Sequence, residues 1–271
     1  MGERRASPIE EIAAALCAPL DPPARAALSA FMAFGRAARA LAQDAGLPPE
    51  RRQALLDGLA ALLDDRKPDV PLALPLAAAA RDVIETGAHL AHARHLLQAL
   101  RQDCAKAAYR DWGDWLLFAR FAAAPYGRLW IEASGADKAA LPAAEALACA
   151  LLLLSQMQDC AADWREAGKV YLPERWLRDH AALSADLALR PATPAWRGVL
   201  TEAARAAAQL LGAAAPLPGL LRHKPQRKAA AVGLALTRRW AARLAGADPS
   251  QEEVRLSALD RLHARLAAWR S

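Results

Sequence analysis

The chain has 271 residues, of which 55% are hydrophobic, and this is enough for one large core or two small ones. The formal net charge of +6 is a modest excess that suits anionic ligands or an anionic membrane surface. It falls short of what a nucleic-acid-binding protein needs, so we expect no nucleic-acid partner. The four cysteines lack metal-binding spacing, which predicts free buried thiols: Cys17, Cys104, Cys149 and Cys160.

Alanine, leucine and arginine dominate, and few segments show the β-branched alternation of a strand, so we expect an all-α protein. Prolines and glycines divide the chain into segments with helical spacing. We expect one helical domain over residues 1–271, with no internal repeat. The expected helices, in chain order, are a short one before Pro19 and then 24–46, 50–65, 81–109, 111–124, 146–164, 196–212, 225–246 and 257–271.

Two aspartates follow the most apolar segment of the chain. The run EALACALLLLSQM, residues 145–157, precedes Asp159 and Asp163, which are neighbours on one helix face because they lie four residues apart. Like charges so placed repel each other unless a cation or an arginine lies against them. Mg²⁺ is commonly held by one or two carboxylates, with water and phosphate oxygens in its other positions. The alternative is a solvated helix end beside Arg165 and Lys169.

The sequence shows neither a signal peptide nor a long membrane-spanning segment. The N-terminal stretch has acids within its apolar part, and the longest strongly apolar run, Ala146–Leu154, is less than half of the roughly 20 residues that a spanning helix needs. We therefore expect a cytoplasmic protein. The basic segment RHKPQRK, residues 222–228, leaves peripheral contact with an anionic membrane open, and a solvated basic loop is the alternative.

The aspartate pair is also the centre of a family resemblance. Asp159-x-x-x-Asp163, followed by Tyr-Leu-Pro at 171–173, resembles the second aspartate motif of squalene and phytoene synthases. The segment 99–129, with its RQD, Tyr-x-x-Trp and Pro-x-Gly-Arg, resembles the hydroxysqualene synthase branch of bacterial hopanoid pathways. The segments 31–59 and 226–249 are similar to that branch too. The resemblance covers most of the chain in the same order.

This resemblance implies an isoprenoid-synthase-type helical bundle around a central apolar cavity. In that family two aspartate motifs face each other and bridging Mg²⁺ ions hold the substrate diphosphate, whose departing charge the metal neutralises. The resemblance therefore implies catalytic and metal-binding roles for Asp159 and Asp163. It implies a prenyl diphosphate substrate, such as presqualene diphosphate, which loses diphosphate to leave a cation that water captures.

The first aspartate motif of the family is missing from this chain. Arg36 matches the family's arginine, but Arg39, Ala40 and Gln43 stand where the motif's aspartates would be. Two readings stay open. Arg36 and Arg39, with Tyr171 and one Mg²⁺ on the second motif, would hold a diphosphate by a different scheme, because guanidinium groups suit phosphate. Alternatively, Arg39 forms a salt bridge with the aspartates and closes the site.

Three smaller departures accompany this loss. Ser155 replaces an asparagine, Phe118 replaces a tyrosine whose hydroxyl helps to hold phosphate, and one extra residue precedes the Gly-basic-Val-Tyr-Leu-Pro segment. Three hypotheses follow: an enzyme of squalene or hopanoid-type isoprenoid biosynthesis with an altered diphosphate site, a pseudoenzyme that binds a paralogous synthase subunit, and a prenyl-lipid carrier that uses only the cavity.

Other polar and aromatic residues carry weaker signals. Asp103 is a candidate polar group for the cavity, and an ion pair with Arg101 or Lys106 on the helix surface is equally expected. Three histidines at every third position fan too widely around a helix for a good metal site, so we expect a solvated face at His89, His92 and His95. Five tryptophans suit either a prenyl cavity or ordinary core packing: Trp112, Trp115, Trp130, Trp164 and Trp176.

Overall fold

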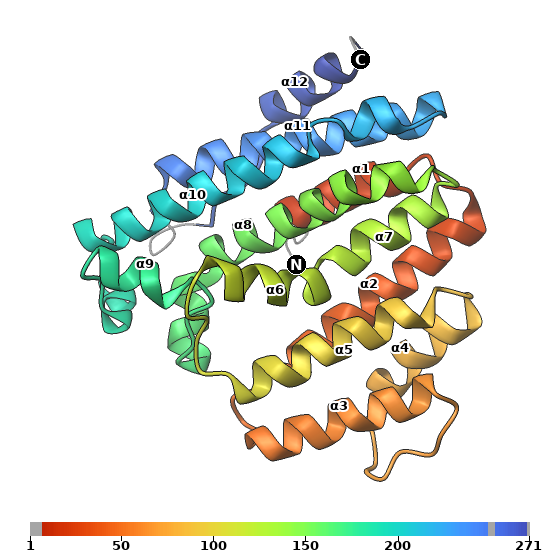
Figure 1. Ribbon diagram of the computed structural model, residues 1–271, viewed down its shortest axis with the longest axis horizontal. Helices are drawn as coiled ribbons and strands as arrows, with labels where there is room; N and C mark the ends of the chain where they lie inside the picture. The colour runs from red at the N-terminus through yellow and green to blue at the C-terminus, as the bar shows by residue number, and fades with distance from the viewer. Residues whose placement is uncertain (1–6, 249–252, 270–271) are drawn as a thin grey trace, which may run out of the picture.

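The computed structural model describes residues 7–248 and 253–269, and in these ranges it contains helices and no strands (Figure 1). The all-α prediction is therefore confirmed. In chain order the α-helices are α1 (Pro8–Cys17), α2 (Pro22–Ala42), α3 (Pro49–Leu63), α4 (Leu74–Glu85), α5 (Leu90–Ala105), α6 (Trp112–Ala122), α7 (Ala124–Ala133), α8 (Leu141–Ala167), α9 (Glu174–Asp179), α10 (Pro194–Ala214), α11 (Lys224–Gly246) and α12 (Ala258–Trp269).

Helix starts follow local chemistry. Ser7 and Glu10 form a capping box at α1, and Asp21, Asp111 and Thr193 accept a hydrogen bond from a backbone N–H of the first turn of α2, α6 and α10. Many helices also have proline in the first turn, where the missing N–H costs nothing.

One expected helix is wrong. Residues 81–109 form two helices, because Gly87 adopts φ +69° between α4 and α5 and interrupts the helical path. The first of these helices begins upstream at Leu74, before the start that we expected. The expected helix 111–124 ends at Ala122, and after a break at Ala123 the helix α7 begins at Ala124, so Pro125, Tyr126 and Gly127 are helical. The last two residues of the expected C-terminal helix, and Pro249 of the family-like segment, lie outside the described residues.

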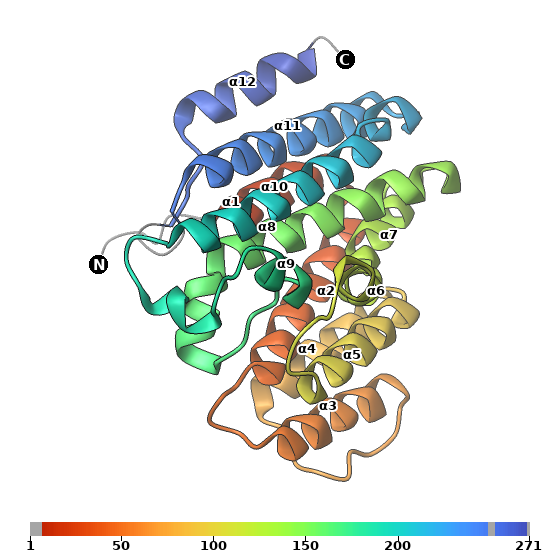
Figure 2. The same cartoon turned by 60° about the vertical axis from the view of Figure 1, so that its left-hand side comes forward.

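The long apolar helix α8 runs through the middle of the bundle (Figures 1 and 2). It packs against α7, α10 and α11, and its buried residues belong to both hydrophobic clusters of the core. The segment 138–167 is long and apolar enough to cross a membrane, yet 72% of its most apolar window is buried inside the protein. Packing against its neighbours therefore accounts for its apolar composition.

Two further layers flank α8. Helices α2 to α5 form one side of the molecule, and α10, α11 and α12 form the other, with α12 outermost (Figures 1 and 2). At its end, α8 stops at Gly168, which adopts the left-handed conformation with φ +62°. The chain then turns back through residues 169–173 toward α2. All four cysteines are free, as expected.

Candidate functional site

The predicted aspartate pair lies on the last turns of α8, where the helix leaves the core. Asp159 is exposed and Asp163 is half-buried, whereas Cys160 and Ala161 between them are buried. Within the described ranges, neither carboxylate has a side-chain hydrogen bond or an ion pair shorter than 4.0 Å. The structure therefore leaves both acids available to an external cation.

The surroundings raise the pKa of both carboxyl groups of this pair. Loss of hydration raises the pKa of Asp159 to about 6, and the Glu253 charge adds to this, although water still screens its exposed side chain. Loss of hydration and the neighbouring Asp159 charge raise the pKa of Asp163 to about 7. Near neutral pH the pair therefore gains from any positive charge placed beside it.

Arg39 on α2 supplies part of that charge from the opposite side. Its positive charge lowers the pKa of both aspartates, against the stronger effect of burial, which raises it. It forms no ion pair with either one among the residues that the structure describes. The expected salt bridge between Arg39 and the aspartates is therefore not formed.

Arg36 precedes Arg39 by one turn and is exposed on the same helix. The positive charges of both arginines act on the phenol of Tyr126, whose pKa is nonetheless raised because the ring is removed from water. Gly35 allows the Tyr126 hydroxyl to lie against the backbone of α2, because a Cβ at position 35 would lie 1.8 Å from the hydroxyl oxygen. This wall of the site is therefore basic where the family resemblance places aspartates.

Gln43, also at the position of a missing aspartate, connects the end of α2 directly to the loop after α8. Its side-chain amide donates a hydrogen bond to the Tyr171 hydroxyl over 2.8 Å. Tyr171 is buried, and its hydroxyl in turn donates to Asp103 Oδ2 over 3.3 Å. Burial, followed by the Asp103 charge, raises the pKa of Tyr171 above its ordinary value. The tyrosine predicted to bind diphosphate is thus part of an internal hydrogen-bond chain.

Asp103 is the centre of this chain and corrects a prediction. It is 3% exposed and pairs with Lys169, whose Nζ lies 2.6 Å from its Oδ1 and 2.7 Å from its backbone oxygen. The Tyr109 hydroxyl donates to the same carboxylate over 2.5 Å. The surface ion pairs expected for Asp103 are wrong: its expected partners Arg101 and Lys106 pair with Asp57 and Asp114.

We define the polar clasp as Gln43, Tyr171, Asp103, Tyr109 and Lys169. Sequence reasoning named Tyr171 and Asp103 but missed the roles of the other three. The available signal was the tyrosine six residues after the RQD and the lysine two residues before Tyr171. The clasp fixes the loop after α8 against α2 and α5, and so fixes how the aspartate pair faces Arg39.

The donor set suits one divalent cation and does not suit a metal cluster shared between two walls. Two unpartnered carboxylates on one helix face supply the oxygen ligands that Mg²⁺ prefers. The opposite wall offers the Arg36 and Arg39 guanidinium groups, whose positive charges repel metal ions, and the Gln43 amide, whose N–H group donates to Tyr171. Within the described ranges, no three histidine, cysteine or acidic side chains gather as a metal site.

Two of the three smaller family departures, Ser155 and Phe118, are structural in this chain. The Ser155 hydroxyl donates to the backbone oxygen of Leu152 over 2.9 Å, so it is satisfied within α8. Phe118 is buried, with its ring centroid 4.9 Å from that of Tyr109 in the clasp. The Phe118 ring therefore supports the clasp and presents no hydroxyl to a ligand.

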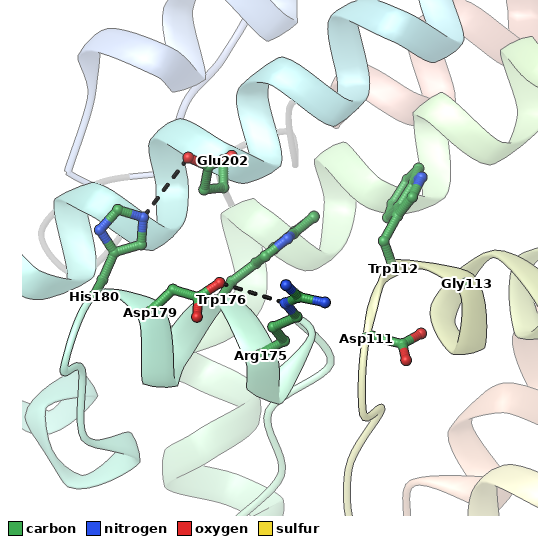
Figure 3. A pocket seen from close by; sticks show the side chains of 8 residues that line it. All are labelled: Asp111, Trp112, Gly113, Arg175, Trp176, Asp179, His180 and Glu202. Carbon is green, nitrogen blue, oxygen red and sulfur yellow. Dashed lines mark ion pairs between the residues drawn. The ribbon is translucent and has the colours of Figure 1, made fainter.

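The tryptophans divide between core and surface. Trp115 and Trp130 are buried, and their indole N–H groups donate to Gln156 and to the Leu16 backbone oxygen. Trp112 and Trp176, whose ring centroids are 5.6 Å apart, line a surface hollow of about 460 Å³ between α6, α9 and α10 (Figure 3). Its other lining residues are mostly charged: Asp111, Gly113, Arg175, Asp179, His180 and Glu202. This hollow does not include the aspartate pair.

The histidine segment differs from expectation. His92 is 7% exposed, and its Nε2 lies 2.9 Å from Glu132 Oε2 on α7. His95 is half-buried, with its ring 5.6 Å from Phe121. The prediction of a solvated face is therefore wrong for these two histidines and holds for His89, which is exposed.

A helical bundle with a carboxylate pair at the end of a central apolar helix defines the isoprenoid-synthase class. The squalene/phytoene synthase family model matches residues 12–260, and the chain belongs to this family. It is 31% identical to a hydroxysqualene synthase of Rhodopseudomonas palustris, over 93% of this chain and 85% of the relative. A hydroxysqualene synthase of Sinorhizobium fredii is 29% identical, over 90% of this chain and 82% of the relative.

Solved structures agree on the fold. A dehydrosqualene synthase crystallised with a ligand superposes with a TM-score of 0.73 at 16% identity, over 94% of this chain and 89% of that one. A squalene synthase from Alicyclobacillus acidocaldarius superposes with a TM-score of 0.64 at 19% identity, over 86% of this chain and 87% of that one. The predicted family and the isoprenoid-synthase-type bundle are thereby confirmed.

Proposed function

We propose that this protein binds a prenyl diphosphate between α2 and α8 and acts on it in squalene or hopanoid-type isoprenoid biosynthesis. The observation that carries the proposal is that Asp159 and Asp163 have no side-chain partner among the described residues. The positive charge of Arg39 on α2 nevertheless acts on both of them. An anion between these walls brings a negative charge to Arg39. A cation bound by Asp159 and Asp163 neutralises negative charge both on these aspartates and on the anion. The relatives' names, hydroxysqualene synthase, support presqualene diphosphate as the substrate.

In this scheme the chain's own residues have separate tasks. Arg36 and Arg39 contact diphosphate oxygens, because a guanidinium donates hydrogen bonds and keeps its charge at all accessible pH values. Asp159 and Asp163 hold one Mg²⁺, which when bound supplies neutralisation of the leaving diphosphate. The clasp keeps Tyr171 and the loop after α8 in place. Apolar residues of α8 and its neighbours exclude water from the hydrocarbon part of the substrate.

The test is turnover of presqualene diphosphate and farnesyl diphosphate by the purified chain with Mg²⁺, followed by product analysis. The proposal predicts diphosphate release that Asp159→Ala reduces at least about 100-fold, because metal neutralisation of a leaving group is worth several kcal/mol. Arg205→Gln, an exposed arginine on α10, is the matched control and should retain full activity. Absence of turnover with every prenyl diphosphate would contradict the catalytic part.

A second candidate is favoured by the basic wall itself. A protein whose first aspartate motif is replaced by Arg39, Ala40 and Gln43 could serve as a non-catalytic partner of an active paralogous synthase. This candidate predicts co-purification with such a synthase at unchanged strength in the Asp159→Ala/Asp163→Ala variant. A carrier of prenyl lipids, in contrast, would retain a squalene-like ligand without Mg²⁺. Each outcome differs from the turnover that the main proposal predicts.

A further inference from the structure

Helix α12 presents an apolar surface that no described part of the chain covers. It lies outside α11 in both views (Figures 1 and 2) and buries only a narrow seam against it: Asp260, Ala264 and Ala268. At about 100° per residue, the opposite side of the helix carries four large apolar residues within an arc of about 80°. These are Leu259 (65% exposed), Leu262 (52%), Leu266 (52%) and Trp269 (82%). We call them the outer stripe.

The position of this stripe is fixed by polar contacts on the inner side. Asp260 Oδ2 accepts hydrogen bonds from Arg243 Nε of α11 over 2.7 Å and from the Ser257 backbone N–H over 2.8 Å. Arg261 Nε donates to Glu11 of α1 over 2.8 Å. The helix is therefore anchored with its alanines inward and its leucines outward. Of the eleven large hydrophobic residues exposed in the described ranges, four belong to this one helix.

A basic hollow adjoins one end of the outer stripe. It has a volume of about 440 Å³ and is lined by Lys224, Arg227 and Lys228 at the start of α11 and by Ala268 and Trp269 at the end of α12. Among the residues that the structure describes, no acidic side chain lines it. The Lys228 Nζ lies 5.6 Å from the centre of the Trp269 ring, so the tryptophan and the cations form one continuous surface.

We propose that the outer stripe and the basic hollow together dock the protein onto the surface of an anionic lipid bilayer. A helix with leucine and tryptophan on one side and basic groups beside them suits the boundary between headgroups and acyl chains. Lysines and an arginine next to the stripe attract phosphate-bearing headgroups. The outer stripe enters the acyl boundary, and lipid phosphates enter the basic hollow.

Charge complementarity favours a bilayer over a second copy of the chain. In a symmetric dimer whose two-fold axis runs along α12, the two basic clusters would lie side by side, because the same patch faces itself in a two-fold interface. The chain as a whole carries a formal net charge of +6, which also opposes self-association and favours an anionic surface. The docking surface lies on α11 and α12, away from the aspartate pair, so this inference does not depend on the proposed function.

The test is flotation of the full chain with phosphatidylcholine vesicles and with phosphatidylcholine/phosphatidylglycerol vesicles. We expect binding to the anionic vesicles only, weakened by high salt because salt screens the headgroup attraction. Leu262→Glu/Leu266→Glu should lower the partition coefficient about tenfold or more, since each buried leucine contributes at least about 1.5 kcal/mol. Lys224→Glu/Arg227→Glu should abolish the preference for anionic vesicles.

Matched controls make the result decisive. Leu117→Glu/Leu183→Glu changes two leucines that are equally exposed on other elements, and it should leave vesicle binding unchanged. Circular dichroism of each variant checks that the helices remain. Equal binding of wild type and Leu262→Glu/Leu266→Glu would overturn the inference. So would a wild type that ignores anionic vesicles but sediments as a dimer that this variant dissociates, because the outer stripe would then be a protein interface.

Discussion

The side-chain amide of Gln43 donates a 2.8 Å hydrogen bond to the hydroxyl of Tyr171, which lies 128 positions further along the chain. This bond joins the basic wall on α2 to the loop that follows the aspartate pair. A carboxylate at position 43 would meet the Asp103 charge through the same tyrosine. The amide is neutral and its N–H group donates a hydrogen bond, so it fits the clasp without adding negative charge. Glutamine in place of the family's aspartate at position 43 therefore supplies the hydrogen bond that joins α2 to the loop after α8.

The buried ion pair of the clasp predicts a large stability effect. Lys169→Met leaves the Asp103 carboxylate, 3% exposed, without its cation. We expect unfolding free energy to fall by about 3–5 kcal/mol, because an unpaired buried charge is costly. Arg175→Met, which breaks the exposed pair with Asp179, is the control and should change it by less than about 1 kcal/mol. Urea unfolding of both variants measures the difference, and equal losses would contradict the role assigned to Lys169.

The aspartate pair predicts a pH dependence with a definite sign. The pKa of Asp163 is about 7 in the folded chain and ordinary, 3.8, when unfolded. A raised acid pKa means that the folded state binds more protons, so this group destabilises the fold fully above pH 7, and the effect vanishes as pH falls from about 7 to about 4. With EDTA present, Asp163→Asn should therefore raise the melting temperature at pH 8 by roughly 2–4 °C, equivalent to about 1 kcal/mol.

The same substitution should have little effect near pH 3, below the unfolded pKa of 3.8, where the carboxyl is mostly neutral in the folded and unfolded states. Thermal melts of wild type and Asp163→Asn across this range measure the sign directly. A melting temperature that rises with pH in wild type relative to the variant would contradict the electrostatics of the site.

Close packing of α7 on α8 predicts the effect of a single methyl group. A Cβ at Gly127 would lie 2.5 Å from the backbone oxygen of Ala144, which cannot rotate away. Gly127→Ala should therefore lower the unfolding free energy by more than about 2 kcal/mol. The control is Gly212→Ala in α10, where a Cβ meets nothing within 4 Å. That change should stabilise by about 0.5–1 kcal/mol, because alanine favours a helix. If chemical denaturation showed that Gly127→Ala and Gly212→Ala change the unfolding free energy in the same direction, this account would be contradicted.

Much of this architecture could be predicted from local patterns. Prolines and glycines between the helices predicted most of the element order, and the apolar run before Asp159 predicted the central helix. The sequence also showed that Arg39, a basic residue, stands where the family's first aspartate motif has an acid. These features depend on neighbours in sequence, where caps and periodicity carry the signal.

Contacts between distant segments could not be predicted in the same way. Lys169 contacts Asp103, 66 positions away in the sequence, and His92 contacts Glu132, 40 positions away. No local sequence pattern indicates either pair. The expected single helix over 81–109 failed because Thr86-Gly87 ends α4 early, and an isolated glycine in a helical pattern is often tolerated. Side-chain partners of charged residues are thus set by the tertiary fold.

The central claim is that a guanidinium has taken over part of the anion binding at this site. The direct test is calorimetric titration of inorganic pyrophosphate into wild type, Arg39→Gln and Asp159→Asn/Asp163→Asn, with EDTA and then with Mg²⁺. We predict metal-independent binding that Arg39→Gln weakens about tenfold or more, since a charged hydrogen bond contributes about 1.5–3 kcal/mol. Mg²⁺ should strengthen binding only where the aspartates remain. Binding that needs Mg²⁺ entirely and is unchanged in Arg39→Gln would contradict the claim.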